Sequence, residues 1–503
     1  MKYHSIIILL CAVLLLDAQS NNETLFRRSS KVSNFNFYVY NNGMLFRDII
    51  DPRNDNTQTA VYSAEWPRNS GHIAPEYMGY GLVFFGKKGG RPYASDVSYF
   101  WDRRVPDKSI FNQMVPGRIG DIKAPSDPKF NGIGWKYVDD PDYIVYSSLD
   151  YNGKGVDNSG SNFNDWPIRE VNGQQKYVFD PLDRKHYPPV YLSDEDMFCV
   201  YKDTDTRADK EYSDTSTTTL PLGLEIQQYI YSWGMSPLND IIVLRYDVIN
   251  KSGADLDSCH IVFATGLDVA SLPYTSNSSF IYGKSILHKT GPNGLAYFKT
   301  MPLSLSVKPS PWISIPPPAA IAFPILQSPQ GYSNNEVGLS DIMYPDSSYN
   351  SLGLKGDSVK YHYFTNKQLY QKTPAFDPDQ PKGYFDLTPT LFSGPFPLKA
   401  NDTARYVFSY MFMRDTNDIF EMQNLLIRMH ANNYQRPSPP PSATLTGKGL
   451  NNSVRLQWNS VSEQATDIIV PDSLGKPFKG YRLLRAQRKE GPYVEIGKWT
   501  TDS

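Results

Sequence analysis

The stretch "DIIVLRYDVINKSGADLDSCHIVFA", residues 240–264, decides the fold class. It contains two runs in which side-chain character alternates with a period of two, which is typical of β-strands. Between them, "NKSGADLD" contains Gly253, a residue that favours turns. The stretch therefore predicts two strands of antiparallel style. In the first run, one face consists of Ile242, Leu244, Tyr246 and Val248, and the other face consists of Ile241, Val243, Arg245 and Asp247. In the second run, one face consists of Cys259, Ile261 and Phe263.

Strand signals recur through the chain. "NFNFYVYNNGMLF" at 34–46 predicts a hairpin that turns at Asn42-Gly43. "YGLVFFGKKGG" at 80–90 predicts a strand that ends in a Gly-Lys turn, and "ARYVFSYMFM" at 404–413 sets aromatic residues on one face. The 35 Tyr, 25 Phe, 34 Gly and 39 Pro fit many short strands joined by turns. Residues 106–189 are rich in Asp, Asn, Gly and Pro and predict long ordered loops, anchored by Trp135, Tyr143, Trp166, Tyr177 and Phe179.

One helix is predicted near the C-terminal end. Asp415, Thr416 or Asn417 can cap it. Its apolar stripe is predicted to contain Phe420, Leu425, Leu426 and Met429. The Pro-rich run that follows, at 434–442, predicts a stiff, extended linker.

Beyond the linker, "SVRLQWNS" and "KGYRLLRAQRKEGPYVEIGKW" predict three further strands. This segment closely resembles the first half of a fibronectin type III domain, with Trp458 as the core tryptophan of the second strand and Tyr481 opening the third. Such a sandwich has seven strands and about 100 residues. Because 67 residues run from Pro437 to Ser503, we expect the domain to continue past the end of this sequence.

The N-terminal 20 residues predict a signal peptide. Lys2 precedes an apolar run from Ile6 to Leu16, and Ala18-Gln19-Ser20 fits a cleavage site. The run is too short for a membrane span, and no later segment approaches one. We therefore expect an extracellular or outer-membrane-surface location. The predicted organisation is a signal peptide at 1–20, a β/loop region at 21–188, a β-sandwich region at 189–433, the linker at 434–442 and a partial fibronectin type III domain at 443–503.

Charge and cysteine content narrow the partners. The 52 acidic and 50 basic residues nearly cancel, which gives no drive toward nucleic acid or an anionic membrane. Cleavage of the signal would remove Cys11 and leave Cys199 and Cys259. In an exported protein these two can form a disulfide, and the alternative is two buried free thiols.

Two acidic segments are candidate calcium sites. "DYNGKGVDNSG" at 150–160 offers Asp150, Asn152 and Asp157 around a glycine turn, but Lys154 stands where a carboxylate is needed. "SDEDMFCVYKDTDTRADKEYSD" at 193–214 offers Asp203 and Asp205 in a pattern that begins like an EF-hand loop. The metal hypothesis is that the fold brings both segments together, and no other cofactor is predicted. The alternative is polar turns with solvated carboxylates.

Catalytic motifs are not visible in the sequence. It contains no G-x-S-x-G, H-E-x-x-H or P-loop pattern. A pair of carboxylates that meet in the fold would still permit a polysaccharide-acting hydrolase. Exposed aromatic residues would instead suit glycan binding, because their rings stack on sugar rings. The candidates are Trp66, Trp101, Trp135, Trp166 and Trp312, and the alternative for each is an anchor in the core or in a loop.

Five phrases in order carry a family resemblance: "YNNGMLF", "YGLVFFGKKGG", "YLSDEDMFCVYKDTDTRADKEYSD", "PLGLEIQQYIYSWGMSPLNDIIVLRYDVINKSG" and "SGPFPLKANDTARYVF". They resemble large exported proteins of Bacteroidota and Ignavibacteriota, which commonly carry fibronectin type III modules and a sorting domain for type IX secretion. Relatives often show an Asp-rich stretch after the "NKSG" turn, whereas "ATGLDVASLPY" retains only Asp268, and the sorting domain does not occur in this sequence.

The resemblance implies a secreted or surface-attached protein and no agreed catalytic residues. We therefore expect a mainly β, multidomain surface protein with a structural or adhesive role that binds glycan or other surface proteins. The alternatives are a secreted polysaccharide hydrolase and a self-assembling surface-layer or filament subunit.

Overall fold

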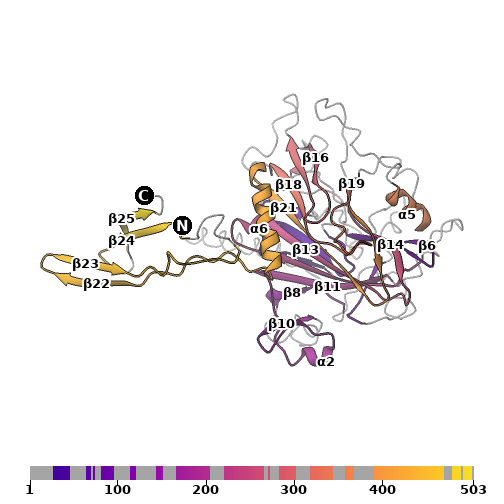
Figure 1. Cartoon of the computed structure of the whole chain (residues 1–503), viewed down its shortest axis with the longest axis horizontal. Helices are drawn as coiled ribbons and strands as arrows, with labels where there is room; N and C mark the ends of the chain where they lie inside the picture. The colour runs from indigo at the N-terminus through magenta and orange to yellow at the C-terminus, as the bar shows by residue number, and fades with distance from the viewer. Residues whose placement is uncertain are drawn as a thin grey trace, which may run out of the picture. The chain divides into compact units, whose positions relative to one another are not determined.

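The protein is mainly β, as the sequence predicts, and its strands form several antiparallel sheets (Figure 1). The computed structural model describes residues 27–45, 64–69, 72–73, 81–95, 114–120, 143–150, 166–203, 220–264, 270–271, 282–301, 318–343, 357–366, 390–469, 478–488 and 491–500. The chain divides into two compact units, Met1–Ile419 and Phe420–Ser503. No helix in the described ranges is long and apolar enough to cross a membrane.

The largest sheet of the first unit has nine described strands, and all their pairings are antiparallel. Its centre is β13 (Ile241–Asn250), which lies between β12 (Leu224–Ser232) and β21 (Thr403–Met413). The alternation seen in the sequence is confirmed, because the main hydrophobic core contains Ile242, Leu244, Tyr246 and Val248 and none of the residues between them. The opposite face of β13 is also largely buried. The remaining strands are β16 (Tyr282–Lys289), β17 (Leu295–Met301) and β18 (Ala320–Gln327) beyond β21, and β11 (Glu195–Asp203), β7 (Met114–Pro116) and β8 (Tyr146–Ser147) beyond β12.

The second large sheet contains β14 (Leu256–Ala264), the other strand predicted from the opening stretch. The turn at Gly253, where φ is +75°, therefore carries the chain from one sheet into the other and does not close a hairpin. The strand predicted at 80–90 is confirmed as β5 (Leu82–Lys88), but it continues through Gly86 and Lys87 and turns at Gly89 and Gly90 into β6 (Arg91–Ser95). The sheet order is β19 (Asp341–Met343), β20 (Thr390–Leu398), β14, β5 (Leu82–Lys88) and β6 (Arg91–Ser95).

The two sheets share one hydrophobic core. Phe263 of β14 packs on Phe408 of β21 and on Tyr246 of β13, with ring centroids 4.7 and 6.3 Å apart. The predicted aromatic face of β21 is confirmed, since every member is buried in this core: Tyr406, Phe408, Tyr410 and Phe412. Burial of such large rings is the main contribution to the stability of this unit.

The N-terminal hairpin signal is also confirmed. In β2 (Asn36–Tyr40), Tyr40 bonds with Met44 across a turn in which Gly43 has φ +88°. Phe35, just before β2, packs against Phe412 with ring centroids 4.5 Å apart, which joins this hairpin to the shared core. A small sheet adds β1 (Arg27–Ser29), β3 (Ala64–Glu65), β4 (His72–Ile73) and β15 (Ala270–Ser271).

The predicted long loops at 106–189 contain more regular structure than expected. Their described parts include β7 and β8, and strands this short show no readable alternation in sequence. Tyr143 and Trp166 are buried as predicted, but Tyr177 and Phe179 are exposed. The other elements are η3 (Ser148–Asp150), β9 (Ile168–Val171), β10 (Gln174–Tyr177) and α2 (Pro181–Arg184).

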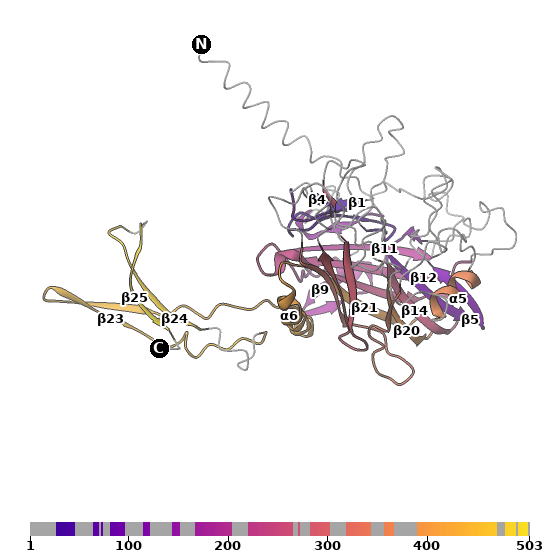
Figure 2. The same ribbon diagram turned by 90° about the horizontal axis from the view of Figure 1, so that it is seen from above.

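A helix that the sequence analysis missed, α5 (Asp357–Thr365), lies beside β6 at the edge of the five-stranded sheet (Figures 1 and 2). Its segment "DSVKYHYFT" has β-branched and aromatic residues with weak helical propensity. Tertiary packing compensates, because Phe364 stacks on Phe85 of β5 with ring centroids 5.1 Å apart.

The predicted C-terminal helix is confirmed, with Asp415 as its cap. The Asp415 carboxylate accepts a hydrogen bond from Asn417 N at 2.9 Å, before η7 (Thr416–Asp418) and α6 (Ile419–Ala431). Leu426 and Met429 are buried, but Phe420 is 40% exposed and Ile419 takes its place on the buried face. Residues 435–444 have no regular element, and two hairpins follow: β22 (Leu445–Leu450) with β23 (Ser453–Trp458), and β24 (Gly480–Arg485) with β25 (Val494–Thr500).

Cys199 and Cys259 are free and buried, so the alternative to a disulfide is the one observed. Both lie in the shared core as small apolar side chains. Burial raises the pKa of each thiol, which keeps the groups protonated and poorly nucleophilic.

Two glycines allow a test of the core packing. At Gly43 a β-carbon would overlap the Tyr201 ring, whereas at Gly89, which also has positive φ, it would meet open space. Gly89→Ala should lower the free energy of unfolding by about 1–2 kcal/mol through backbone strain alone. Gly43→Ala should cost about 1–3 kcal/mol more, because the core must also move. Urea unfolding followed by tryptophan fluorescence checks this, and equal losses would contradict the packing.

Candidate functional site

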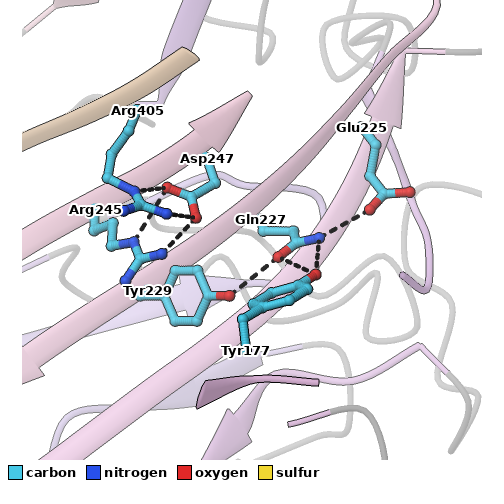
Figure 3. A network of polar contacts seen from close by, with 7 residues as sticks. All are labelled: Tyr177, Glu225, Gln227, Tyr229, Arg245, Asp247 and Arg405. Carbon is cyan, nitrogen blue, oxygen red and sulfur yellow. Dashed lines mark hydrogen bonds and ion pairs between the residues drawn. The ribbon is translucent and has the colours of Figure 1, made fainter. Parts of the chain in front are cut away.

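A network of charged and polar side chains lies on the face of the nine-stranded sheet that points away from the shared core (Figure 3). Alternation along β13 puts Arg245 and Asp247 on this face. The strand register places Asp247 between Gln227 of β12 and Arg405 of β21, and Arg245 opposite Tyr229. Residues far apart in sequence thus meet because three strands are in register.

Asp247 is the centre of the network. Its carboxylate accepts two hydrogen bonds from Arg245, at 3.1 and 2.5 Å, and two from Arg405, at 2.7 and 3.0 Å. Burial alone would raise the pKa of Asp247, but the two guanidinium groups outweigh it and hold the pKa below the usual value. The carboxylate is therefore ionised and fully paired.

Arg245 is also held from its other side. Its guanidinium lies over the Tyr229 ring, 4.6 Å from the centroid, where the negative face of the ring attracts it. The side chain of Arg245 is only 14% exposed, whereas that of Arg405 is 41% exposed. The network therefore reaches solvent through Arg405.

Gln227 extends the network along the same face, from Tyr229 to Tyr177 and Glu225. Its Oε1 accepts hydrogen bonds from Tyr229 Oη at 3.0 Å and Tyr177 Oη at 3.1 Å. Its Nε2 lies 2.9 Å from Tyr177 Oη and donates to Glu225 Oε1 at 3.0 Å. Because every polar atom of this amide has a partner, its orientation is fixed.

At this end the network is bordered by apolar side chains that are open to solvent. Glu225 accepts a hydrogen bond from Gly120 N at 2.9 Å, and the tip of the Phe179 ring lies against Gly120. Tyr177, Phe179 and Leu182 are 44%, 58% and 65% exposed. We call these three residues the 177–182 patch. Burial raises the pKa of Tyr177 to about 12, so its hydroxyl stays a neutral donor.

Among the predicted calcium residues, Asp203 is the one whose side chain the structure describes. Asp203, the last residue of β11, is fully buried and accepts hydrogen bonds from Ser95 Oγ and, at 2.5 Å, from Leu222 N. Asp150 is described only as part of η3, while Asn152, Asp157 and Asp205 lie outside the described residues. Within the described ranges no group of three His, Cys, Asp or Glu is arranged to hold a metal ion. The calcium site stays a prediction.

Asp203 instead belongs to a set of buried carboxyl groups that anchor backbone. Asp357, at the start of α5, accepts from Ala94 N at 3.4 Å and Leu220 N at 3.0 Å, beside the groups that bind Asp203. At the other end of β11, Asp196 accepts from Leu192 N at 2.6 Å and Ser193 N at 2.8 Å. The acidic segment at 193–214 thus supplies structural acceptors in its described part, which its sequence did not reveal.

Two of the five tryptophans proposed for glycan binding are core residues. Trp66 and Trp166 are fully buried, so the alternative of a core anchor is confirmed for them. Trp101, Trp135 and Trp312 lie outside the described residues. The exposed aromatic side chains near the network are Tyr177 and Phe179, which the sequence analysis named as buried anchors.

The network gives a first test. Asp247→Asn leaves Arg245 buried without its carboxylate, which should lower the free energy of unfolding by about 3–5 kcal/mol. Arg405→Ala removes a half-exposed partner and should cost about 1 kcal/mol, because solvent screens that interaction. Chemical denaturation of both variants checks the order, and an equal or larger loss for Arg405→Ala would contradict the central role of Asp247.

The buried acids give a second test. Burial raises the pKa of Asp203 to about 7 and those of Asp196 and Asp357 to about 6, above the value of about 4 in an unfolded chain. Between about pH 4 and 7 the folded chain keeps protons that the unfolded chain has lost, so stability falls as the pH rises through this window. The free energy of unfolding should therefore be higher at pH 5 than at pH 8, by a few kcal/mol.

Asp203→Asn is the matched variant for that test, because an amide keeps an acceptor for Leu222 N and cannot ionise. It should narrow the difference in stability between pH 5 and pH 8. An unchanged difference would show that Asp203 does not take up a proton in this range.

Comparison with known proteins does not assign this chain to a family. No family model matches it, and no curated protein matches it at a significant level. The arguments on function therefore rest on the geometry and chemistry of the chain itself.

Proposed function

We propose that this is an exported surface protein with a structural or adhesive role, and that it binds glycan at the 177–182 patch. The observation that carries the proposal is the position of this patch. Tyr177 and Phe179 are exposed at the border of a fixed polar network, and Leu182 is exposed a few residues further along the chain. A sugar ring has an apolar C–H face and hydroxyl edges, so it matches such a surface.

The polar surroundings suit hydroxyl groups. Asp183 and Gln175 are exposed close to the patch in sequence and can accept or donate hydrogen bonds. One oxygen of the Asp180 carboxylate already accepts a hydrogen bond, from Leu182 N at 2.8 Å, which caps α2. The cap fixes the backbone that carries Leu182, which lowers the entropy lost on binding.

A binding role is favoured over hydrolysis by the use of the carboxylates. Glycoside hydrolysis needs one carboxyl group that donates a proton and one that attacks or activates water. Asp247 is neutralised by two arginines, and Asp196 and Asp203 are buried acceptors of backbone and hydroxyl groups. These groups support the scaffold and do not face a substrate.

A monomeric binding module is also favoured over a filament subunit. An open sheet edge invites pairing with another chain, and proteins protect such edges. The edge strand β6 contains Pro92 and is accompanied by α5, and the edge strand β16 has an irregular register between Leu287 and Lys289. Both features hinder edge-to-edge assembly at these described strands.

Export and modular organisation complete the proposal. The signal-like residues 1–20, which lie outside the described residues, support secretion. The two sheets with one core support a β-sandwich in the first unit. In the second unit, the Trp458 ring meets those of Tyr481 and Trp499 at 5.4 and 5.3 Å, which supports a fibronectin type III-like module after the Pro-rich linker.

The test is binding of the secreted protein to insoluble cellulose, chitin and xylan. The double variant Phe179→Ala/Leu182→Ala should bind at least tenfold more weakly to whichever polysaccharide the wild-type protein binds, because it loses two apolar side chains of the 177–182 patch. Tyr177→Phe should retain binding, since it keeps the ring. Phe420→Ala, an exposed aromatic of α6, is the control and should bind as the wild type does.

Two outcomes would overturn the glycan proposal. If the wild-type protein binds none of these polysaccharides, the glycan proposal is wrong and a protein becomes the expected partner of the 177–182 patch. Equal binding by the double variant and the wild type would place the glycan elsewhere on the chain.

A further inference from the structure

A row of polar side chains crosses the hydrophobic core of the first unit. The strand register sets Cys199, Gln228, Tyr246 and Tyr406 directly opposite one another on four neighbouring strands, β11, β12, β13 and β21. All four residues are at most 1% exposed and lie on the face that packs against the five-stranded sheet. Polar groups in such an environment need partners, because water does not reach them from outside.

Protein groups supply part of these partners. Tyr201 Oη donates to Gln228 Oε1 at 3.1 Å, and Ser393 Oγ of the facing sheet donates to Tyr406 Oη at 3.1 Å. Cys199 Sγ donates to Tyr40 O at 3.6 Å. The row therefore extends from the N-terminal hairpin, through the large sheet, to the five-stranded sheet.

Two groups in the middle of the row have no hydrogen-bond partner among the residues that the structure describes: Gln228 Nε2 and Tyr246 Oη. They belong to residues that face each other on adjacent strands, where β-carbons lie about 5 Å apart. After burial, the charges of Tyr246 and Cys199 contribute most to the raised pKa of Tyr201, which places the three groups within electrostatic reach. The two unpartnered groups thus lie in one small region.

We propose that an ordered water molecule is bound here as part of the fold, accepting a hydrogen bond from Gln228 Nε2 and bonding to Tyr246 Oη. A buried polar group without a partner is destabilising, and buried waters are held by hydrogen bonds to such groups. A metal ion does not suit the position, because the amide nitrogen is a donor and the row contains no carboxylate. The water joins Gln228 to Tyr246, the two middle residues of the row.

Hydrogen bonds within the row restrict how the two sheets lie against each other. Apolar surfaces can slide past one another at low cost, whereas a hydrogen-bonded row is satisfied in one alignment. The Ser393–Tyr406 bond links the two sheets directly, and the water holds Tyr246, which is the strand neighbour of Tyr406. The water therefore contributes to the specificity of the packing as well as to its stability.

Two conservative variants test the proposal in the full chain. Tyr246→Phe removes only the hydroxyl group, and Gln228→Met removes the amide with little change of volume. If each group bonds to water, each variant should raise the equilibrium constant of unfolding about tenfold. If the groups have no partner at all, each variant removes an unsatisfied group and the constant should stay the same or fall, which would overturn the proposal.

The double variant and a control make the test specific. Because both groups bond to the same water, Tyr246→Phe/Gln228→Met should have a smaller effect than the product of the single effects. A purely multiplicative effect would overturn the single shared water. Tyr406→Phe calibrates the loss of a phenol bond to a protein group in the same row.

A crystal structure of the wild-type protein gives the direct readout, independent of how the variants fold. A density peak within hydrogen-bond distance of Gln228 Nε2 and Tyr246 Oη is expected. An ordered core without that peak would overturn the proposal.

Discussion

The ion pairs of Asp247 with Arg245 and Arg405 are the constraint on which the rest of the structure depends. β13 is the middle strand of the largest sheet and is covered on both faces, so its charged residues must find partners inside the sheet. They do so only in the observed register of β12, β13 and β21. That register aligns the polar row of the core on one face and supports Tyr177 on the other.

Much of the local structure follows from sequence alone, because alternation and turn residues act over short distances. The period-two pattern predicts β13 and β14, Asn42-Gly43 predicts the first hairpin, and Asp415 predicts the start of the C-terminal helix. The weak points are equally local. Strands of two or three residues contain too few positions to alternate, and α5 forms through packing on Phe85 against its own propensity.

The site was much less accessible to prediction. Arg405 and Asp247 are 158 residues apart, and a one-residue shift in pairing would separate them. The sequence marks Asp203 as a possible ligand because carboxylates in loops bind cations, yet the structure buries it as a backbone acceptor at the end of β11. Composition reveals which groups are present, whereas strand register decides which of them meet.

The passage of the chain from β13 into β14 has a consequence for how the molecule is assembled. β13 and β14 each pair on one side with an earlier strand, β12 and β5, whereas their partners on the other side, β21 and β20, follow more than a hundred residues later. Such distant pairings slow folding, and they leave one edge of β13 open until Met413 has been synthesised. Both large sheets of a nascent chain with this topology therefore stay incomplete until late in synthesis.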